Sequence, residues 1–188
     1  MANTNLSQWL SATDINLKLS ADSELETISA MLDLASNSGV VADVKQLASE
    51  LLAHEIYTPS PTGCCAVVFR VLSPVVAEPR MFFGRFDGGI GYYSKKGQPI
   101  DLIVLIIAPP EKQDDFVQLT QKMERVLCES SVSEPLRAAE DAREILRVFS
   151  DSVFNSFVCE QCGQLMPEEH ACVKGNKKLC LRCALKYD

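Results

Sequence analysis

Apolar residues recur along the chain with two spacings, one typical of helices and one typical of strands. Apolar positions three and four residues apart predict amphipathic helices, the first of which has a capping box formed by Ser23 and Glu26. The expected helices cover residues 24–39, 43–55, 111–129 and 141–157, with a short one started by Ser133 and Pro135. Runs of β-branched and apolar residues predict strands at 15–19, 64–72, 80–86 and 101–108.

Two of these strands show little alternation between apolar and polar residues. The runs CCAVVFRVL (64–72) and DLIVLIIA (101–108) are apolar almost throughout, as expected of strands covered on both faces. Helices also precede and follow the group of strands. The chain is therefore predicted to be an α/β protein, with a mixed β-sheet flanked by helices on both faces.

Composition and charge narrow the class of protein. The chain of 188 residues, 47% of them hydrophobic, suits one sizeable domain, or one domain with a small appendage. Residues 1–158 hold 13 basic against 21 acidic side chains, a net charge of −8, so binding to nucleic acid is not expected. The N-terminus MANTNLSQWL lacks a secretory signal pattern, and no apolar run is long enough to span a bilayer. We expect a cytoplasmic protein without membrane contact, in which thiols stay reduced.

The cysteines are concentrated near the C-terminus. Five of the eight fall within residues 159–183, and four of them form two Cys-x-x-Cys pairs separated by 17 residues, Cys159/Cys162 and Cys180/Cys183. Each pair can direct two thiolates at one ion, so two pairs complete a tetrahedral site. The spacing predicts a small C-terminal zinc ribbon in residues 156–188, after a larger domain in residues 1–155.

Other interpretations of these cysteines stay open. The thiols could be free on a disordered tail, or one pair could be a redox dithiol. Four thiolates would also accept iron in place of zinc. His170 and Cys172 lie between the two pairs, and either could replace one of the four ligands.

The C-terminal segment resembles the short zinc finger at the end of bacterial RNA-polymerase secondary-channel regulators. The similarity rests on its opening, CEQCG, and its close, LCLRC, and covers about 30 residues. The long coiled-coil arm of those regulators is lacking. The resemblance therefore implies a shared module and not a shared function.

The rest of the chain, to about Phe149, resembles the IIA domain of the bacterial phosphoenolpyruvate-dependent sugar phosphotransferase system, in its fructose/mannitol/nitrogen-regulatory class. The resemblance is carried by ELLAHE (50–55), GCCAVVFR (63–70), and the blocks at 97–127 and 133–149, of which 97–127 is the most specific. It implies a mixed β-sheet with helices on both faces. This agrees with the fold expected from the apolar pattern.

The resemblance also indicates where a reaction should occur. Members of the family carry a phosphoryl group on a histidine in a segment like G-I-A-I-P-H-A-R. Gly63 and Arg70 match the ends of that segment, whereas Val67 takes the place of the proline and Val68 that of the histidine. The phosphoacceptor position is therefore expected to be non-functional.

Two further family positions have changed as well. A second family histidine corresponds to about Asp115, and an arginine late in the second helix corresponds to His54. A phosphohistidine needs an exposed imidazole with cations nearby, and Asp115 would repel the phosphoryl group. No catalytic residue is therefore assigned.

The sequence thus favours a catalytically silent IIA-like regulatory module that binds a protein partner, with phosphotransferase-system or transcription components as the candidates. One alternative is an active phosphoryl carrier that uses His54, Cys64 or Cys65, although cysteines in such a run are more often small buried apolar residues. Another is a transcription-linked regulator acting through its zinc ribbon, where Lys174, Lys177 and Lys178 form a small basic cluster.

Overall fold

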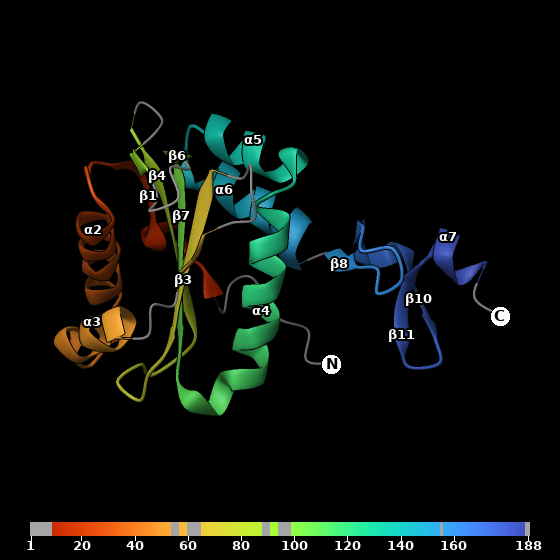
Figure 1. Ribbon diagram of the computed structural model, residues 1–188, viewed down its shortest axis with the longest axis horizontal. Coiled ribbons are helices and arrows are strands. Elements are labelled where there is room, and N and C mark those ends of the chain that lie inside the picture. Colours follow the sequence, from red (N-terminus) through yellow and green to blue (C-terminus); the bar gives the residue numbers. More distant parts are fainter. Residues whose placement is uncertain are drawn as a thin grey trace.

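A mixed β-sheet forms the centre of the protein (Figure 1). The computed structural model describes residues 9–53, 57–59, 65–87, 91–93, 99–154 and 156–186. The sheet has five strands in the order β1-β4-β7-β3-β2. Their bounds are β1 (Ile15–Leu19), β2 (Tyr57–Pro59), β3 (Ala66–Leu72), β4 (Arg80–Phe86) and β7 (Leu102–Ala108), and a separate short pair consists of β5 (Tyr92–Tyr93) and β6 (Pro99–Ile100).

The strand β7 lies at the middle of the sheet. It pairs in parallel with β3 and antiparallel with β4, while β1 runs parallel to β4 and β2 antiparallel to β3. Every residue of β7 is buried, because helices cover both faces of the sheet at this position. The predicted mixed sheet, and the predicted strands at 15–19 and 80–86, are confirmed.

Helices cover the sheet on both sides, as the pattern predicted (Figure 1). One face carries α2 (Glu24–Asn37) and α3 (Val44–Ala53), and the other carries α4 (Gln113–Val126), α5 (Ser130–Ala138) and α6 (Ala142–Phe149). The hydroxyl of Ser23 accepts the N–H of Glu26 at 3.2 Å, which is the expected N-cap. Shorter turns of helix are η1 (Ala12–Asp14), η2 (Pro110–Lys112), η3 (Ser150–Phe154) and η4 (Glu168–His170).

The sheet separates two apolar cores. Alternate residues of β3 enter different cores, because successive side chains of a strand point to opposite faces. Val68 packs with Val104 and the residues of α4 to α6, whereas Val67 and Phe69 pack with the residues of α2 and α3.

Two helix boundaries differ from the prediction. The short helix begins at Ser130 and not at Ser133, because Val132 and Leu136 lie four residues apart and both pack into the core. The helix predicted over 141–157 ends at Phe149 and continues as the π-helical turn η3, and Phe157 then enters a strand. Phe157 packs against a separate apolar cluster, and this tertiary contact overrides the helical pattern.

Residues 156–186 form a C-terminal module with its own small core. It contains β8 (Ser156–Val158), β9 (Leu165–Pro167), β10 (Ala171–Lys174), β11 (Lys177–Cys180) and α7 (Leu181–Ala184), and its strands form two antiparallel hairpins. Its strands β8 and β9 contact η3, and the module lies to the right of the sheet and its helices in Figure 1. In the described parts of the chain, no helix combines the length and apolar character that crossing a membrane requires.

Candidate metal centre

The first cysteine pair lies in the tight turn between β8 and β9. The N–H of Cys159 donates to the carbonyl of Gln164 at 2.9 Å, and the N–H of Gly163 donates to the carbonyl of Cys159 at 2.8 Å. Gly163 has a φ of 73°, a conformation that favours glycine because it has no Cβ. The turn therefore bends the backbone so that Cys159 and Cys162 lie on the same side.

The second pair lies where β11 passes into α7. Cys180 is the last residue of β11, and Cys183 is in the first turn of the helix. The N–H of Cys180 donates to Sγ of Cys159 at 3.3 Å, so the two pairs are in direct contact. An amide that donates to a cysteine sulfur stabilises the negative charge of a thiolate.

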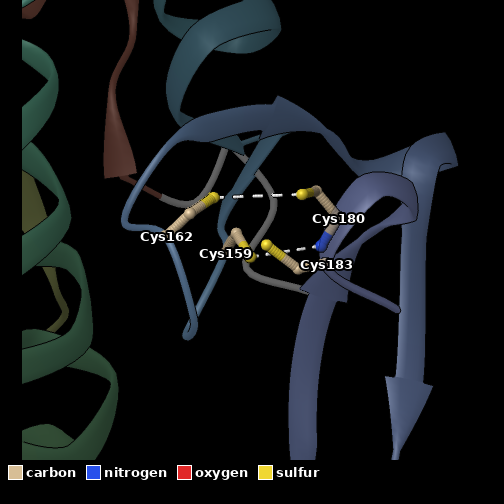
Figure 2. A group of neighbouring side chains, drawn as sticks. All are labelled: Cys159, Cys162, Cys180 and Cys183. Carbon is tan, nitrogen blue, oxygen red and sulfur yellow. Dashed lines mark hydrogen bonds between the residues drawn. The ribbon is translucent and has the colours of Figure 1, made fainter. Parts of the chain in front are cut away.

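The four sulfur atoms form one compact group (Figure 2). The Sγ atoms of Cys159, Cys162, Cys180 and Cys183 all lie within 4.8 Å of one another, and those of Cys162 and Cys180 are 3.9 Å apart. Four sulfurs at about 2.3 Å from a tetrahedral zinc ion are about 3.8 Å apart. The group is therefore of the right size to hold one metal ion.

The two alternative ligands do not belong to this group. His170 is exposed at the end of η4, and Cys172 is half-buried in β10. The group of cysteines that could hold a metal includes neither of them. The structure thus brings together the four residues predicted from the spacing.

The thiols of the group have opposite pKa shifts. Burial raises the pKa of Cys159, but donation from the backbone N–H groups of Cys180, Cys162 and Gln161 outweighs it and lowers the pKa to about 6. The pKa of Cys183 is raised to about 12. Burial is the largest cause, and hydrogen bonds with the other three cysteines and the charge of Cys159 raise it further. Cysteines bind a metal ion as thiolates, so metal uptake by thiols of this group must release protons.

The position aligned with the family histidine is in the interior of the protein. Val68 is in the middle of β3, where it pairs with Thr58 on one side and Val104 on the other. Its exposure is 0%. Asp115 is half-buried in the first turn of α4. His54, Cys64 and Gly63 lie outside the described residues.

Arg70 has a partner that the sequence did not indicate. Its guanidinium forms an ion pair with the carboxylate of Glu124 on α4. Both side chains are half-buried, with exposures of 30% and 23%. The two residues are 54 positions apart, so no local pattern in the sequence could have found this pair.

Cys65 differs from the expectation of a buried strand residue. It lies just before β3 and is half-buried. Its carbonyl accepts the N–H groups of Asp101 and Leu102 at 2.8 and 3.2 Å. The backbone at this point is therefore held in place, while part of the residue remains accessible.

Fold and candidate site together define the class: an α/β IIA-type domain followed by a module with a four-cysteine candidate metal centre. The family model described as phosphoenolpyruvate-dependent sugar phosphotransferase system, EIIA 2, matches residues 8–152. The chain belongs to this family. The match ends before Cys159, so the C-terminal module lies outside the region that defines the family.

Relatives and solved structures agree with this assignment. A nitrogen regulatory protein from Bradyrhizobium diazoefficiens is 31% identical over 93 residues, which cover 47% of this chain and 61% of that protein. A PTS system fructose-specific EIIA component from Haloferax volcanii is 26% identical over 126 residues, 67% of this chain and 82% of that protein. The crystal structure of nitrogen regulatory protein IIA-Ntr from Neisseria meningitidis has a TM-score of 0.63 at 16% identity, covering 73% of this chain and 94% of the other.

The IIA mannitol structure from Escherichia coli has a TM-score of 0.59 at 20% identity, and the match covers 74% of this chain and 97% of that one. At such low identity the similarity establishes the fold alone. A further match is to a complex of the E. coli mannitol enzyme IIA with phosphorylated enzyme IIB, with a TM-score of 0.58 at 20% identity over 75% of this chain and 96% of that one.

Proposed function

We propose that this protein is a catalytically silent IIA-type regulatory protein that binds a protein partner, with residues 156–188 acting as a structural zinc ribbon. The observation that carries the proposal is the complete burial of Val68 in the central sheet. A phosphoacceptor must expose a nucleophilic nitrogen to the donor protein. Valine has no nucleophile, and the position has no access to solvent.

The ion pair of Arg70 supports the same conclusion. A phosphoryl site needs cations that are available to balance the charge of the phosphate. Arg70 matches the basic end of the family segment, but its charge is compensated by Glu124. The cation that remains from the family pattern thus has an acidic partner within the protein.

The alternative of an active carrier depends on other nucleophiles. The chain has two histidines, His54 and His170. His170 is exposed, but it belongs to the C-terminal module and not to the sheet. Cys65 is half-buried. We favour the silent protein because none of these residues occupies the aligned position on β3.

Incubation with the labelled phosphocarrier protein of the phosphotransferase system tests this proposal. We expect no label on the purified chain under conditions in which an active IIA protein is fully labelled. Acid-labile label that disappears in His54→Ala would instead establish an active carrier. Label that is lost in Cys64→Ser or Cys65→Ser would indicate a phosphocysteine.

The proposal of zinc rests on the donor set. Four thiolates at tetrahedral spacing are typical of structural zinc sites. The module has a core of few residues, with Phe157 and Leu179 as its large apolar members, so a metal ion is expected to organise its fold. Reduced thiols fit a cytoplasmic location.

Elemental analysis of protein purified without chelator tests the proposed metal. We expect one zinc ion per chain, and one iron ion per chain would show that the metal is iron and not zinc.

The module also has an exposed surface suited to a protein partner. Leu181 and Leu185 lie four residues apart and are 52% and 83% exposed, so they form one ridge along α7 and the turn that follows it. Arg182 and Lys186 are exposed next to them. Apolar side chains beside basic ones favour an acidic protein segment with apolar residues of its own.

Pull-down from a cell extract with matched variants tests this surface. We expect the double variant Leu181→Ser and Leu185→Ser to lose a partner that the unmodified chain retains. Leu25→Ser is the control, because Leu25 is 66% exposed on α2, far from the module (Figure 1). If the double variant and the control retain the same partners, this surface is not the one that binds them.

A further inference from the structure

Exposure to solvent distinguishes one cysteine of the candidate metal centre from the other three. Cys162 is exposed and Cys183 is half-buried, whereas Cys159 and Cys180 are buried. The Sγ atom of Cys162 lies 3.8 Å from the side-chain oxygen of Gln164, which is itself an exposed residue. A small reagent that diffuses in water therefore reaches Cys162 before the other cysteines of the group.

A second sulfur lies next to this exposed one. The Sγ atoms of Cys162 and Cys180 are 3.9 Å apart and point toward each other (Figure 2). A disulfide bond is about 2 Å long, so a relative shift of about 2 Å would join the two sulfurs. Cys180 is 2% exposed. Burial thus shields Cys180 from a dissolved oxidant while leaving it within reach of Cys162.

Metal binding keeps both sulfurs in a reactive form. A cysteine binds a metal ion as the thiolate, and the thiolate is also the form that reacts with oxidants. Oxidation of a thiolate is favoured by its exposure, and a redox-sensing cysteine often lies beside a second cysteine that forms a disulfide with it. Cys162 and Cys180 meet both conditions.

We infer that Cys162 is an oxidation site through which a peroxide releases the metal ion, an inference that rests on the proposed zinc ribbon. The Cys162 thiolate attacks one oxygen of hydrogen peroxide, which breaks the O–O bond, leaves a sulfenic acid on the sulfur and releases hydroxide. The Cys180 thiolate then attacks the sulfenic sulfur, a second hydroxide leaves, and a disulfide forms. The two sulfurs lose two electrons in total, and the peroxide gains them.

The disulfide removes two of the four metal ligands. A structural zinc site is closed by four protein ligands, and only Cys159 and Cys183 remain as thiolates after the reaction. The ion is then released to a chelator in solution. A thiol reductant converts the disulfide back into two thiols, so the reaction is reversible.

The helix α7 depends on this metal centre. It has four residues, and a helix of this length is not stable by itself. Cys180 precedes it directly and Cys183 lies within it, so a bound metal ion would hold the helix in place. Leu181 and Leu185, the ridge proposed to bind a partner, lie two residues before and after Cys183. Oxidation of Cys162 is therefore expected to displace this ridge.

Peroxide treatment of the zinc-loaded full chain tests the inference, with a chromogenic chelator in solution to record zinc release. We expect about one equivalent of peroxide per chain to release the zinc ion, because one disulfide consumes one peroxide. Peptide mapping without reductant should find a disulfide between Cys162 and Cys180. Dimedone, which traps sulfenic acids, should label Cys162.

Two serine variants are matched controls. Cys128 is exposed just after α4, Cys172 is half-buried in β10, and neither belongs to the group of four. Cys128→Ser and Cys172→Ser should release zinc at the rate of the unmodified chain. Slower release in either variant would place the reactive thiol outside the candidate metal centre and overturn the assignment of Cys162.

Hydrogen exchange follows α7 through the same reaction. Peroxide should increase exchange in residues 181–186, and reductant added with zinc should reverse the increase, while residues 102–108 of the central strand stay protected. Zinc that is retained after peroxide treatment, or a disulfide between other cysteines, would overturn the inference and leave the zinc ribbon intact. A chain that holds no zinc before peroxide is added would overturn the proposed ribbon itself.

Discussion

The cysteines of the candidate metal centre differ in burial although their sulfur atoms form one compact group. Cys159 and Cys180 are buried, with exposures of 0% and 2%, whereas Cys162 is exposed. The buried pair belongs to the small core of the module, and the exposed residue borders solvent. Cys172 is also half-buried in this module, but it lies outside the group of four. The Cys-x-x-Cys spacing, and not proximity in sequence alone, therefore identified the cysteines that lie together in the structure.

Cys162 belongs to the group of four cysteines and Cys172 does not, which predicts different outcomes for two serine substitutions. Cys162→Ser should abolish stoichiometric zinc, with a loss of affinity greater than the roughly 10–100-fold that follows loss of an outer-shell partner. Cys172→Ser should leave one zinc ion per chain. Elemental analysis after size-exclusion chromatography measures both variants. Loss of zinc in Cys172→Ser would place that residue among the ligands.

At the scale of elements, β3 shows how one strand supplies apolar residues to both cores. Its residues alternate between the two cores, and its pairing with β7 continues without a break from Ala66 to Leu72. Val68 completes the apolar layer under α4. The strand thus contributes packing where the family pattern has a histidine.

Returning a histidine to this position should therefore not create a carrier. Val68→His would bury an imidazole that has no designed partner, at a cost of about 1–3 kcal/mol for an unsatisfied polar group. We expect a lower urea midpoint and no phosphoryl label. Val117→His is the control, because Val117 is 40% exposed on α4 and should change stability little. Efficient labelling of Val68→His would show that the silent site is reversible by one substitution.

At the scale of the whole molecule, the larger part of the chain and the C-terminal module differ in how much apolar surface they bury. Residues 9–154 contain two apolar cores on either side of the sheet, while residues 156–186 have one small cluster that includes Cys159 and Cys180. The large cores need no metal. The small one buries too little apolar surface to be stable alone.

Chelation should therefore act mainly on the C-terminal module. We expect it to lower the melting temperature of the larger part by only about 2–4 °C, which corresponds to roughly 1 kcal/mol in a domain of this size. The reason is that the apolar cores of the larger part contain none of the four cysteines of the candidate metal centre. Calorimetry with and without chelator measures the shift, and Cys162→Ser should show no further change. A collapse of the main transition would mean that the two parts fold as one unit.

Local patterns predicted much of this arrangement. Apolar runs identified β3 and β7, the capping residue Ser23 identified the start of α2, and cysteine spacing identified all four members of the compact cysteine group. Each of these signals lies within a few residues of the structure it determines. The start of α5 and the end of α6 were wrong, because residues of those segments pack against distant parts of the fold.

The sequence by itself determined the periodicity of the helices and strands, the residue types available for a metal, and the absence of a nucleophilic side chain at Val68. Only the tertiary structure decided that Val68 is fully buried and that Arg70 pairs with Glu124. Each of these contacts joins residues from separate elements. Their formation depends on how the sheet and α4 pack together, and such packing leaves no local pattern in the sequence.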